Sequence, residues 1–172
     1  LQNFKAFGNS DKKLADVVNA NNNIYVSMNF DNQNASVREP INLPYALKTD
    51  IMGDRRVIEE AREIKFSNVR SIMPEILNGT DNIGFINITR DKDGVARGFY
   101  PLFNYKDSFY KHLDLLVGMD LLNLDSTKIR AYGNNILLND KIKIPITNDG
   151  KAYLNWYNNP NKHYETVSVR SE

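Results

Sequence analysis

Two histidines carry the most versatile chemistry in this sequence, since imidazole both transfers protons and binds metals near neutral pH. They are His112 and His163, and the 172 residues contain no cysteine. Disulfides, thiolate metal sites and cysteine nucleophiles are therefore excluded. His112 lies two residues before Asp114 in a helical pattern, and this spacing directs the two side chains to different faces. We expect a half-exposed helix residue at His112, a surface residue at His163 and no metal site at either.

The acidic run at residues 91–94, Asp-Lys-Asp-Gly, invites comparison with a calcium-binding loop. When an EF-hand loop is aligned on Gly94, Asp91 and Asp93 occupy ligand positions. Thr89 would then be the first ligand and Tyr100 stands where the bidentate glutamate is needed, so two required ligands are missing. The flanking residues are typical of strands rather than helices. We therefore interpret the run as a turn.

Motifs of the familiar catalytic classes are missing from the sequence. It has no Gly-rich phosphate loop, no nucleophile elbow and no paired-histidine zinc motif. Carboxylates are numerous, so a hydrolase that uses an Asp/Glu pair stays open as an alternative. We predict that this chain has no catalytic residue, no metal and no cofactor.

Four residues are suited to contact a small organic ligand through charge or an aromatic ring: Asp93, Arg97, Tyr100 and Trp156. Three of these residues also have a simpler explanation. A turn cap accounts for Asp93, a cross-strand ion pair for Arg97 and core packing for Trp156. We keep the four as candidate ligand-binding residues beside these structural interpretations.

Length and charge limit the remaining classes of function. The chain has the length of one domain, and its 41% hydrophobic content allows a real core. Twenty-two basic and 21 acidic residues leave a net charge of +1, which gives no strong field to attract nucleic acid. No run of about 18 apolar residues is present, so we expect no membrane-spanning helix. We predict a single domain over residues 1–172 that does not bind nucleic acid.

Hydrophobic periodicity predicts a few helices among many short strands. Helices are expected over 11–20, 53–63, 74–77 and 107–122, and strands over 24–28, 83–88, 95–100, 128–131, 136–138, 142–144, 152–156 and 164–169. The two strands between 83 and 100 are expected to form an antiparallel hairpin around Gly94, and 31–50 to be a loop. The predicted fold class is α/β (α+β), with one mixed, largely antiparallel sheet and helices packed on it.

Four passages follow one another in an order that resembles a known family. They cover residues 11–15 with 23–26, residues 83–87 with 91–97 and 101–102, residues 144–146 with 149–150 and 154–157, and residues 164–168. The second passage is the most specific, since a Gly-Phe strand, an Asp-x-Asp-Gly turn and an Arg before Pro-Leu occur together. The family is the second class of CHASE domains, the cyclase- and histidine-kinase-associated sensory extracellular modules.

The resemblance implies an extracytoplasmic sensor domain, periplasmic or at the cell surface, of a bacterial transmembrane receptor. Its membrane helices would lie outside this chain. The resemblance favours a nucleotide (adenylate or guanylate) cyclase as the cytoplasmic output, with a protein kinase as the second choice. The resemblance also implies a homodimer and an unknown small-molecule or environmental stimulus. The family's first strand–helix unit and its final strand before the membrane have no counterpart that we recognise in residues 1–172. A dimerisation or scaffold module without a ligand is the alternative.

Overall fold

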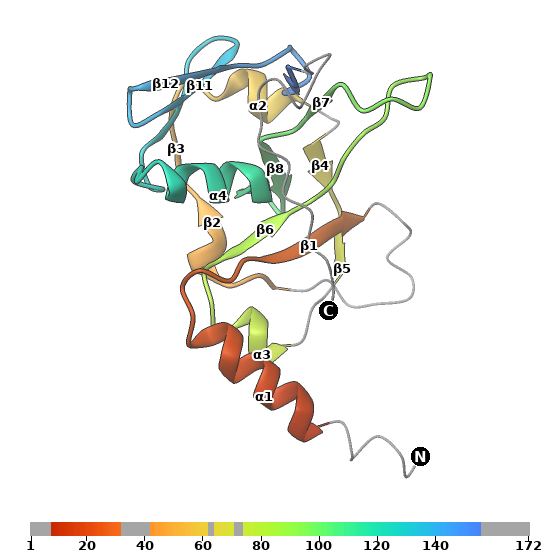
Figure 1. The fold of residues 1–172 in the computed structure, drawn as a ribbon. Coiled ribbons are helices and arrows are strands. Elements are labelled where there is room, and N and C mark those ends of the chain that lie inside the picture. The colour runs from red at the N-terminus through yellow and green to blue at the C-terminus, as the bar shows by residue number, and fades with distance from the viewer. Residues whose placement is uncertain (1–7, 32–41, 62–63, 71–73, 156–172) are drawn as a thin grey trace, which may run out of the picture.

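The computed structural model describes residues 8–31, 42–61, 64–70 and 74–155. Its helices are α1 (Gly8–Asn19), α2 (Arg56–Glu60), α3 (Pro74–Leu77) and α4 (Leu113–Leu121), and Tyr45–Leu47 forms a 3-10 turn, η2. Figure 1 shows the strands gathered around α4, with α1 and α3 together at one end of the molecule. Trp156, His163 and the strand expected over 164–169 lie outside the described residues.

The strands of the described chain are short and form four hydrogen-bonded sheets. They are β1 (Val26–Asp31), β2 (Lys48–Thr49), β3 (Ile51–Gly53), β4 (Lys65–Phe66), β5 (Asn68–Arg70), β6 (Ile83–Phe85), β7 (Gly98–Phe99), β8 (Leu102–Tyr105), β9 (Ser108–Lys111), β10 (Ile129–Ala131), β11 (Asn135–Leu138), β12 (Ile142–Pro145) and β13 (Ala152–Tyr153). The sheet orders are β5-β1-β6, β12-β11-β10-β3, β13-β7 and β2-β9-β8-β4. The α+β class is confirmed, although the strands are shared among several sheets where one was expected.

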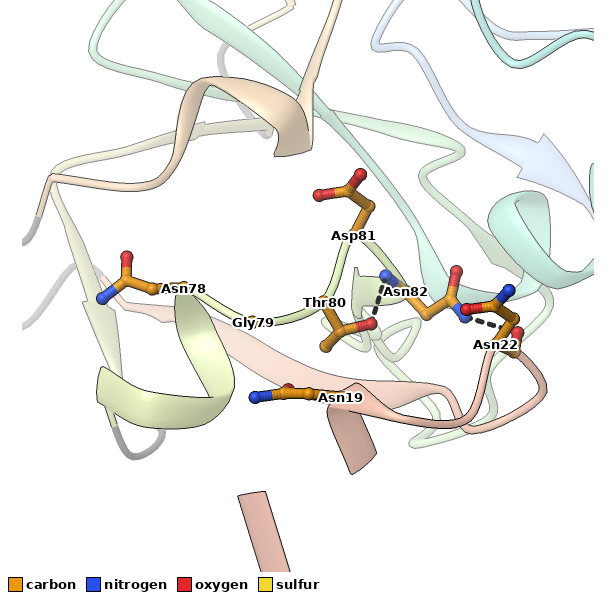
Figure 2. Close-up of a pocket in the computed structure, with 7 residues that line it drawn as sticks. All are labelled: Asn19, Asn22, Asn78, Gly79, Thr80, Asp81 and Asn82. Carbon is orange, nitrogen blue, oxygen red and sulfur yellow. Dashed lines mark hydrogen bonds between the residues drawn. The ribbon is translucent and has the colours of Figure 1, made fainter. Parts of the chain in front are cut away.

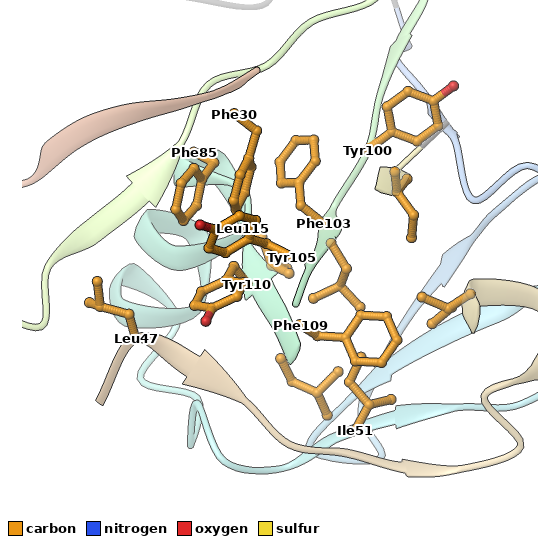
Figure 3. Packing of buried hydrophobic residues seen from close by; sticks show 14 of the residues in the cluster. Phe30, Leu47, Ile51, Phe85, Tyr100, Phe103, Tyr105, Phe109, Tyr110 and Leu115 are labelled. Carbon is orange, nitrogen blue, oxygen red and sulfur yellow. The ribbon is translucent and has the colours of Figure 1, made fainter. Parts of the chain in front are cut away.

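A stack of aromatic rings packs two of these sheets together. Phe30 of β1 lies face to face with Phe85 of β6, with ring centroids 3.8 Å apart, and Phe66 of β4 stacks on Phe30 at 5.2 Å. Phe103 of β8 is fully buried and meets both Phe66 and Phe85 edge-on. Figure 3 shows Phe30, Phe85 and Phe103 converging in the core. Because β1 and β6 belong to one sheet and β4 and β8 to another, the rings unite the two sheets in one hydrophobic core.

Helix α4 lies directly on β6, and a glycine makes this close approach possible. A Cβ atom added at Gly84 would lie 2.5 Å from the Cα atom of Leu113, the first residue of α4. An isolated β-bridge between Phe85 and His112 joins the same two places through the backbone. The helix then buries Leu115, Leu116 and Met119 against the core. Backbone contact at Gly84 therefore sets the position of α4.

Helix α1 packs on α3 through a small cluster that is separate from the main core. The cluster consists of Ala15 and Val18 of α1 and Ile76 of α3, with the half-buried Ile24 and Val26 against it. The predicted helix over 11–20 is confirmed, as is the helical turn over 74–77. Among the described residues α1 buries Ala15 and Val18, whereas α4 buries the larger Leu115, Leu116 and Met119, so the apolar attachment of α1 is the weaker of the two.

The predicted antiparallel hairpin between 83 and 100 is wrong. The reversal itself is present, because the Gly94 N–H donates to the Asp91 carbonyl at 2.8 Å and Gly94 has a φ of 83°. However, β6 pairs in parallel with β1, and β7 pairs with β13. All three residues of β6 are buried, so this strand is covered on both faces although it is an edge strand of its sheet, whereas a two-stranded ribbon would leave one face exposed. Long-range burial has overridden the local hairpin signal.

The long helix predicted over 107–122 is also partly wrong, because its first turn is strand β9. Lys106 and Asp107 have φ values of 49° and 56°, which produce a tight two-residue reversal between β8 and β9. Phe109 and Leu113 are four residues apart, and this spacing imitated a helical stripe. The helix begins only at Leu113.

Two glycine-to-alanine substitutions test the contact between α4 and β6. We expect Gly84→Ala to lower the free energy of unfolding by roughly 1–3 kcal/mol, because the new methyl group would press on the backbone of α4. Gly118→Ala, inside α4, is the matched control, because an added Cβ there has no atom within 4 Å. It should leave stability unchanged or raise it by up to about 1 kcal/mol. Urea denaturation of both variants makes the comparison, and equal stabilities would contradict the close packing.

Candidate functional site

Residues 86–97, called the finger from here on, connect β6 to β7 and project from the body of the domain (Figure 1). Near its tip the Asp91 N–H donates to the Val95 carbonyl at 2.9 Å, which closes the reversal around Gly94. At its two ends the backbone of the finger bonds to neighbouring segments: the Ile86 N–H donates to the Met28 carbonyl of β1 at 3.0 Å, and the Arg97 carbonyl accepts from the Leu154 N–H at 2.9 Å. Side-chain contacts at both ends add to these two bonds.

The side chain of Asn87 anchors the first end of the finger to β1. Its Oδ1 accepts a hydrogen bond from the Phe30 N–H at 2.7 Å, and its Nδ2 donates to the Phe30 carbonyl at 2.8 Å. The amide group thus takes the place of a backbone partner where β6 has already ended. An asparagine directly after a buried strand was the available sequence signal for this anchor, and the sequence reasoning missed its role.

Four charged residues at the other end form a cluster that we call the latch: Asp91, Asp93, Arg97 and Lys151. Arg97 binds Asp93 with both guanidinium nitrogens, at 2.8 and 2.6 Å, and reaches Asp91 at 3.0 Å. Lys151 donates to the other oxygen of Asp91 at 2.8 Å, and the residue is only 9% exposed. The latch ties the finger to the segment before β13.

Three of the latch residues, Asp91, Asp93 and Arg97, have pKa values shifted so that the charged form is favoured. Hydrogen bonds from Arg97, and then from the Val95 N–H, lower the pKa of Asp93 to about 2. Hydrogen bonds from Lys151 and then Arg97 lower the pKa of Asp91, and the two carboxylates raise the pKa of Arg97. The sign of each shift favours the charged form. Mild acid therefore leaves the latch closed.

The structure brings two of the four candidate ligand-binding residues together. Asp93 and Arg97 bind each other directly, as residues four apart in a tight turn. Tyr100 is 3% exposed and belongs to the core, and its hydroxyl lies 3.4 Å from the Asp149 carboxylate. Trp156 lies outside the described residues. Lys151, which sequence reasoning did not single out, completes the group because it contacts Asp91 from 60 positions away.

Two adjoining hollows lie where α1 meets α3 and the loop that follows it. The smaller, about 310 Å³, is lined by Asn19, Asn22 and residues 78–82, and Figure 2 shows their side chains around it. The larger, about 470 Å³, lies between α1 and the start of α3. Asn19 lines both hollows, and its amide also donates to the Glu75 carbonyl. Both volumes suit a small ligand, and one bound here would bridge α1 and α3.

His112 is the one histidine of the described chain, and the expectation of a half-exposed helix residue is wrong for it. It is 2% exposed, and its ring packs against Phe99 and Phe103 at centroid distances of 5.0 and 5.9 Å. It stands before α4 as the N-cap, and its Nδ1 accepts a hydrogen bond from the Asp114 N–H at 3.1 Å. Its Nε2 is buried without a hydrogen-bond partner in the described chain. Burial lowers the pKa of His112 from 6.5, and nearby Asp114 opposes this effect.

The described residues offer no reaction centre of the kinds considered from the sequence. No aspartate or glutamate among them is buried, so the facing pair that a hydrolase needs is not found there. No group of three His, Asp or Glu side chains in the described ranges is placed to hold a metal ion. No described helix has the length and apolar character needed to cross a bilayer.

The fold and the latch define an α+β domain with an aromatic core and a finger held by ion pairs. The family model of the CHASE2 domain matches residues 2–171, nearly the whole chain. The chain therefore belongs to the CHASE2 domain family, which consists of sensory extracellular domains, and the resemblance seen in the sequence is confirmed. A search of curated proteins and a search of solved structures gave no match.

The latch predicts a difference between two similar substitutions. Asp91→Asn weakens contacts to both Arg97 and Lys151, whereas Asp93→Asn leaves the contacts between Asp91 and the two cations in place. We expect backbone amides of the finger to exchange with deuterium faster in the Asp91 variant than in the Asp93 variant. Hydrogen–deuterium exchange with mass spectrometry measures this. Equal exchange in the two variants would show that Lys151 does not hold the finger.

Proposed function

We propose that this chain is the extracytoplasmic sensor domain of a bacterial transmembrane receptor whose cytoplasmic output is a nucleotide cyclase. The observation that carries the proposal is the CHASE2 match over residues 2–171. A sensory extracellular domain acts on the cell interior only through the membrane, so membrane helices in the same receptor follow from this placement. A cyclase output fits a dimeric receptor, and we include a homodimer in the proposal.

The uneven packing of the domain supports a sensor role. A stimulus changes a receptor only if it binds one of two arrangements better than the other, and a hundredfold preference corresponds to about 2.7 kcal/mol. Among the described residues, helix α1 buries Ala15 and Val18 against Ile76 of α3, while the aromatic core holds the strands and α4. A binding event at the boundary between these two parts would therefore need to move only α1.

Two places on the domain suit a stimulus molecule. At the latch, a ligand with a carboxylate or phosphate group would compete with Asp93 for Arg97, and Tyr100 and Trp156 follow in the chain as further candidate contacts. In the polar hollows around Asn19, a ligand with several hydrogen-bonding groups would connect α1 to α3. Asp93 and Arg97 of the latch are candidates proposed from the sequence, and Asp91 and Lys151 join them in the structure. The hollows are a second site, found from the structure alone.

The absence of cysteine from the 172 residues allows a direct test of which side of the membrane the domain occupies. In the full-length receptor, Tyr132→Cys would place a thiol at a side chain that is 72% exposed. We expect a membrane-impermeant maleimide to label it in intact cells once the outer envelope is permeable. The unsubstituted receptor is the control for any thiol elsewhere in the protein. Labelling that appears only after cell lysis would contradict the extracytoplasmic placement.

The output is tested on the same full-length receptor. Its gene should encode membrane helices beside this segment and a cyclase domain beyond them. Membranes that contain the receptor should form cyclic AMP or cyclic GMP, and replacement of residues 1–172 by an unrelated folded domain should change the rate. A parent sequence without membrane helices beside this segment would end the receptor proposal.

A further inference from the structure

We propose that the proton is a stimulus of this domain and that it binds at Nδ1 of His112, where it moves the ring's hydrogen bond from the Asp114 backbone to the Asp114 carboxylate. This change of hydrogen-bond partner is a property of this chain. Its role as a signal rests on the proposed receptor function.

The geometry determines the resting state. Nδ1 of His112 accepts the Asp114 N–H at 3.1 Å, so Nδ1 carries no hydrogen and the hydrogen of the neutral ring is on Nε2. This bond satisfies one of the free N–H groups at the start of α4. The ring packs against Phe99 and Phe103, and Nε2 is buried with no acceptor in the described chain. The ring thus supports the helix through Nδ1, while the N–H of Nε2 has no partner in the described chain.

The same residues provide a second arrangement. When a proton from solvent binds Nδ1, that nitrogen becomes a donor and can no longer accept the Asp114 N–H. The Asp114 carboxylate Oδ2 lies only 3.5 Å from Nδ1 and is exposed, so it is ready to accept the new N–H. No other bond is made or broken. The start of α4 loses its cap, while the ring gains a charged partner.

Three charged side chains of the described chain lie near His112 and bear on its protonation: Asp114, Lys111 and Lys151. Asp114 on α4 is the nearest, and it favours the protonated ring. Lys111 precedes His112 in the chain, so its side chain leaves the strand on the opposite face, where Asp81 opposes the effect of burial on its pKa. Lys151 lies against Gly98 of β7, but the latch engages its ammonium group. The residues of β6, β7 and β8 that contact His112 are Phe85, Phe99 and Phe103, and they are uncharged.

The direction of the pH effect follows from burial. Because burial lowers the pKa of His112 below 6.5, the resting arrangement is fully present above that pH. As the pH falls below 6.5, an unfolded chain binds the proton more readily than the folded one, so the stability of the resting arrangement decreases until the pKa of the folded state is reached. The latch carboxylates stay ionised over this range, so His112 is the group of the described chain placed to respond to mild acid.

A contact at the other end of α4 provides a route to α1. The Tyr25 hydroxyl donates to the carboxylate of Asp120, in the last turn of α4. Tyr25 lies in the connection between α1 and β1, beside the small cluster that holds α1. A shift of α4 that follows loss of its N-terminal cap therefore pulls on the segment where α1 is attached. In Figure 1, α4 lies between the upper sheets and β6, and α1 lies beyond β1 at the lower end.

NMR on the 172-residue chain tests the proposed change of hydrogen-bond partner at His112, and only two histidine rings need to be resolved. We expect the His112 ring to titrate below pH 6.5, and the Asp114 amide resonance to move with the same midpoint. Asp114→Asn, at an exposed site, should lower that midpoint because it removes the carboxylate partner. Either of two results would overturn the proposal: a His112 ring that does not titrate while the chain is folded, or an Asp114 amide resonance that does not shift as the ring titrates.

A second measurement follows the effect into α4. His112→Asn supplies a good N-cap that does not titrate in this range. At about pH 5, amides of α4 should exchange faster in the unsubstituted chain than in this variant, because a protonated His112 ring no longer accepts the Asp114 N–H at the start of the helix. At neutral pH the two should be equal, and His163→Asn should behave like the unsubstituted chain at both pH values. If His112→Asn does not fold, the titration of Asp114→Asn decides alone.

The signalling role is tested separately in the full-length receptor. We expect mild acid outside the membrane to change cyclic nucleotide formation, and both Asp114→Asn and Tyr25→Phe to reduce that change. If the NMR titration is found but the receptor's output ignores external pH, the proton is not its stimulus and that part of the proposal fails. If the receptor has no cyclase or lacks membrane helices, the proposed function fails, while the titration of His112 is unaffected.

Discussion

The stacked rings of Phe30 and Phe85 hold the domain together, because they unite strands that hydrogen bonds leave in separate sheets. The strands of the described chain have between two and six residues, too few for backbone pairing alone to stabilise them. The rings lie 3.8 Å apart, and Phe66, Phe103 and Tyr110 pack around them. Gly84, the neighbour of Phe85, allows α4 to rest on the same strand. The fold is thus organised by one point of side-chain contact more than by any sheet.

The polar groups of the domain lie at three different places relative to this aromatic core. The latch is at the surface, where four ionised side chains satisfy one another and fix the finger. His112 is at the inner boundary, where the ring touches both the aromatic core and the first turn of α4. The polar hollows are at the far end, beside the weakly attached α1. A sensory domain needs such a gradient from rigid to mobile, since a signal requires one part to move relative to another.

The sequence predicted what local spacing determines. The helix over residues 11–20, the Pro74 helical turn and the reversal at Gly94 are all local signals, and each is present. The partners of β6 and β7 are not local, because they depend on which distant strands bury the same faces. For this reason the expected hairpin was wrong. The positive φ values at Lys106 and Asp107 were equally hidden, since neither residue is glycine or asparagine.

The same distinction applies to the candidate site. Asp93 and Arg97 are four residues apart and form an ion pair within one turn, whereas the sequence led us to expect a cross-strand ion pair for Arg97 and named no partner for it. Lys151 and the burial of His112 could not be read from neighbours in the chain. One further consequence comes from the small cluster beneath α1. Because the described residues buried there are Ala15, Val18 and Ile76, we expect heating to release this helix before the aromatic core unfolds. The domain would then melt in two steps of unequal size, the smaller one confined to the end that carries α1.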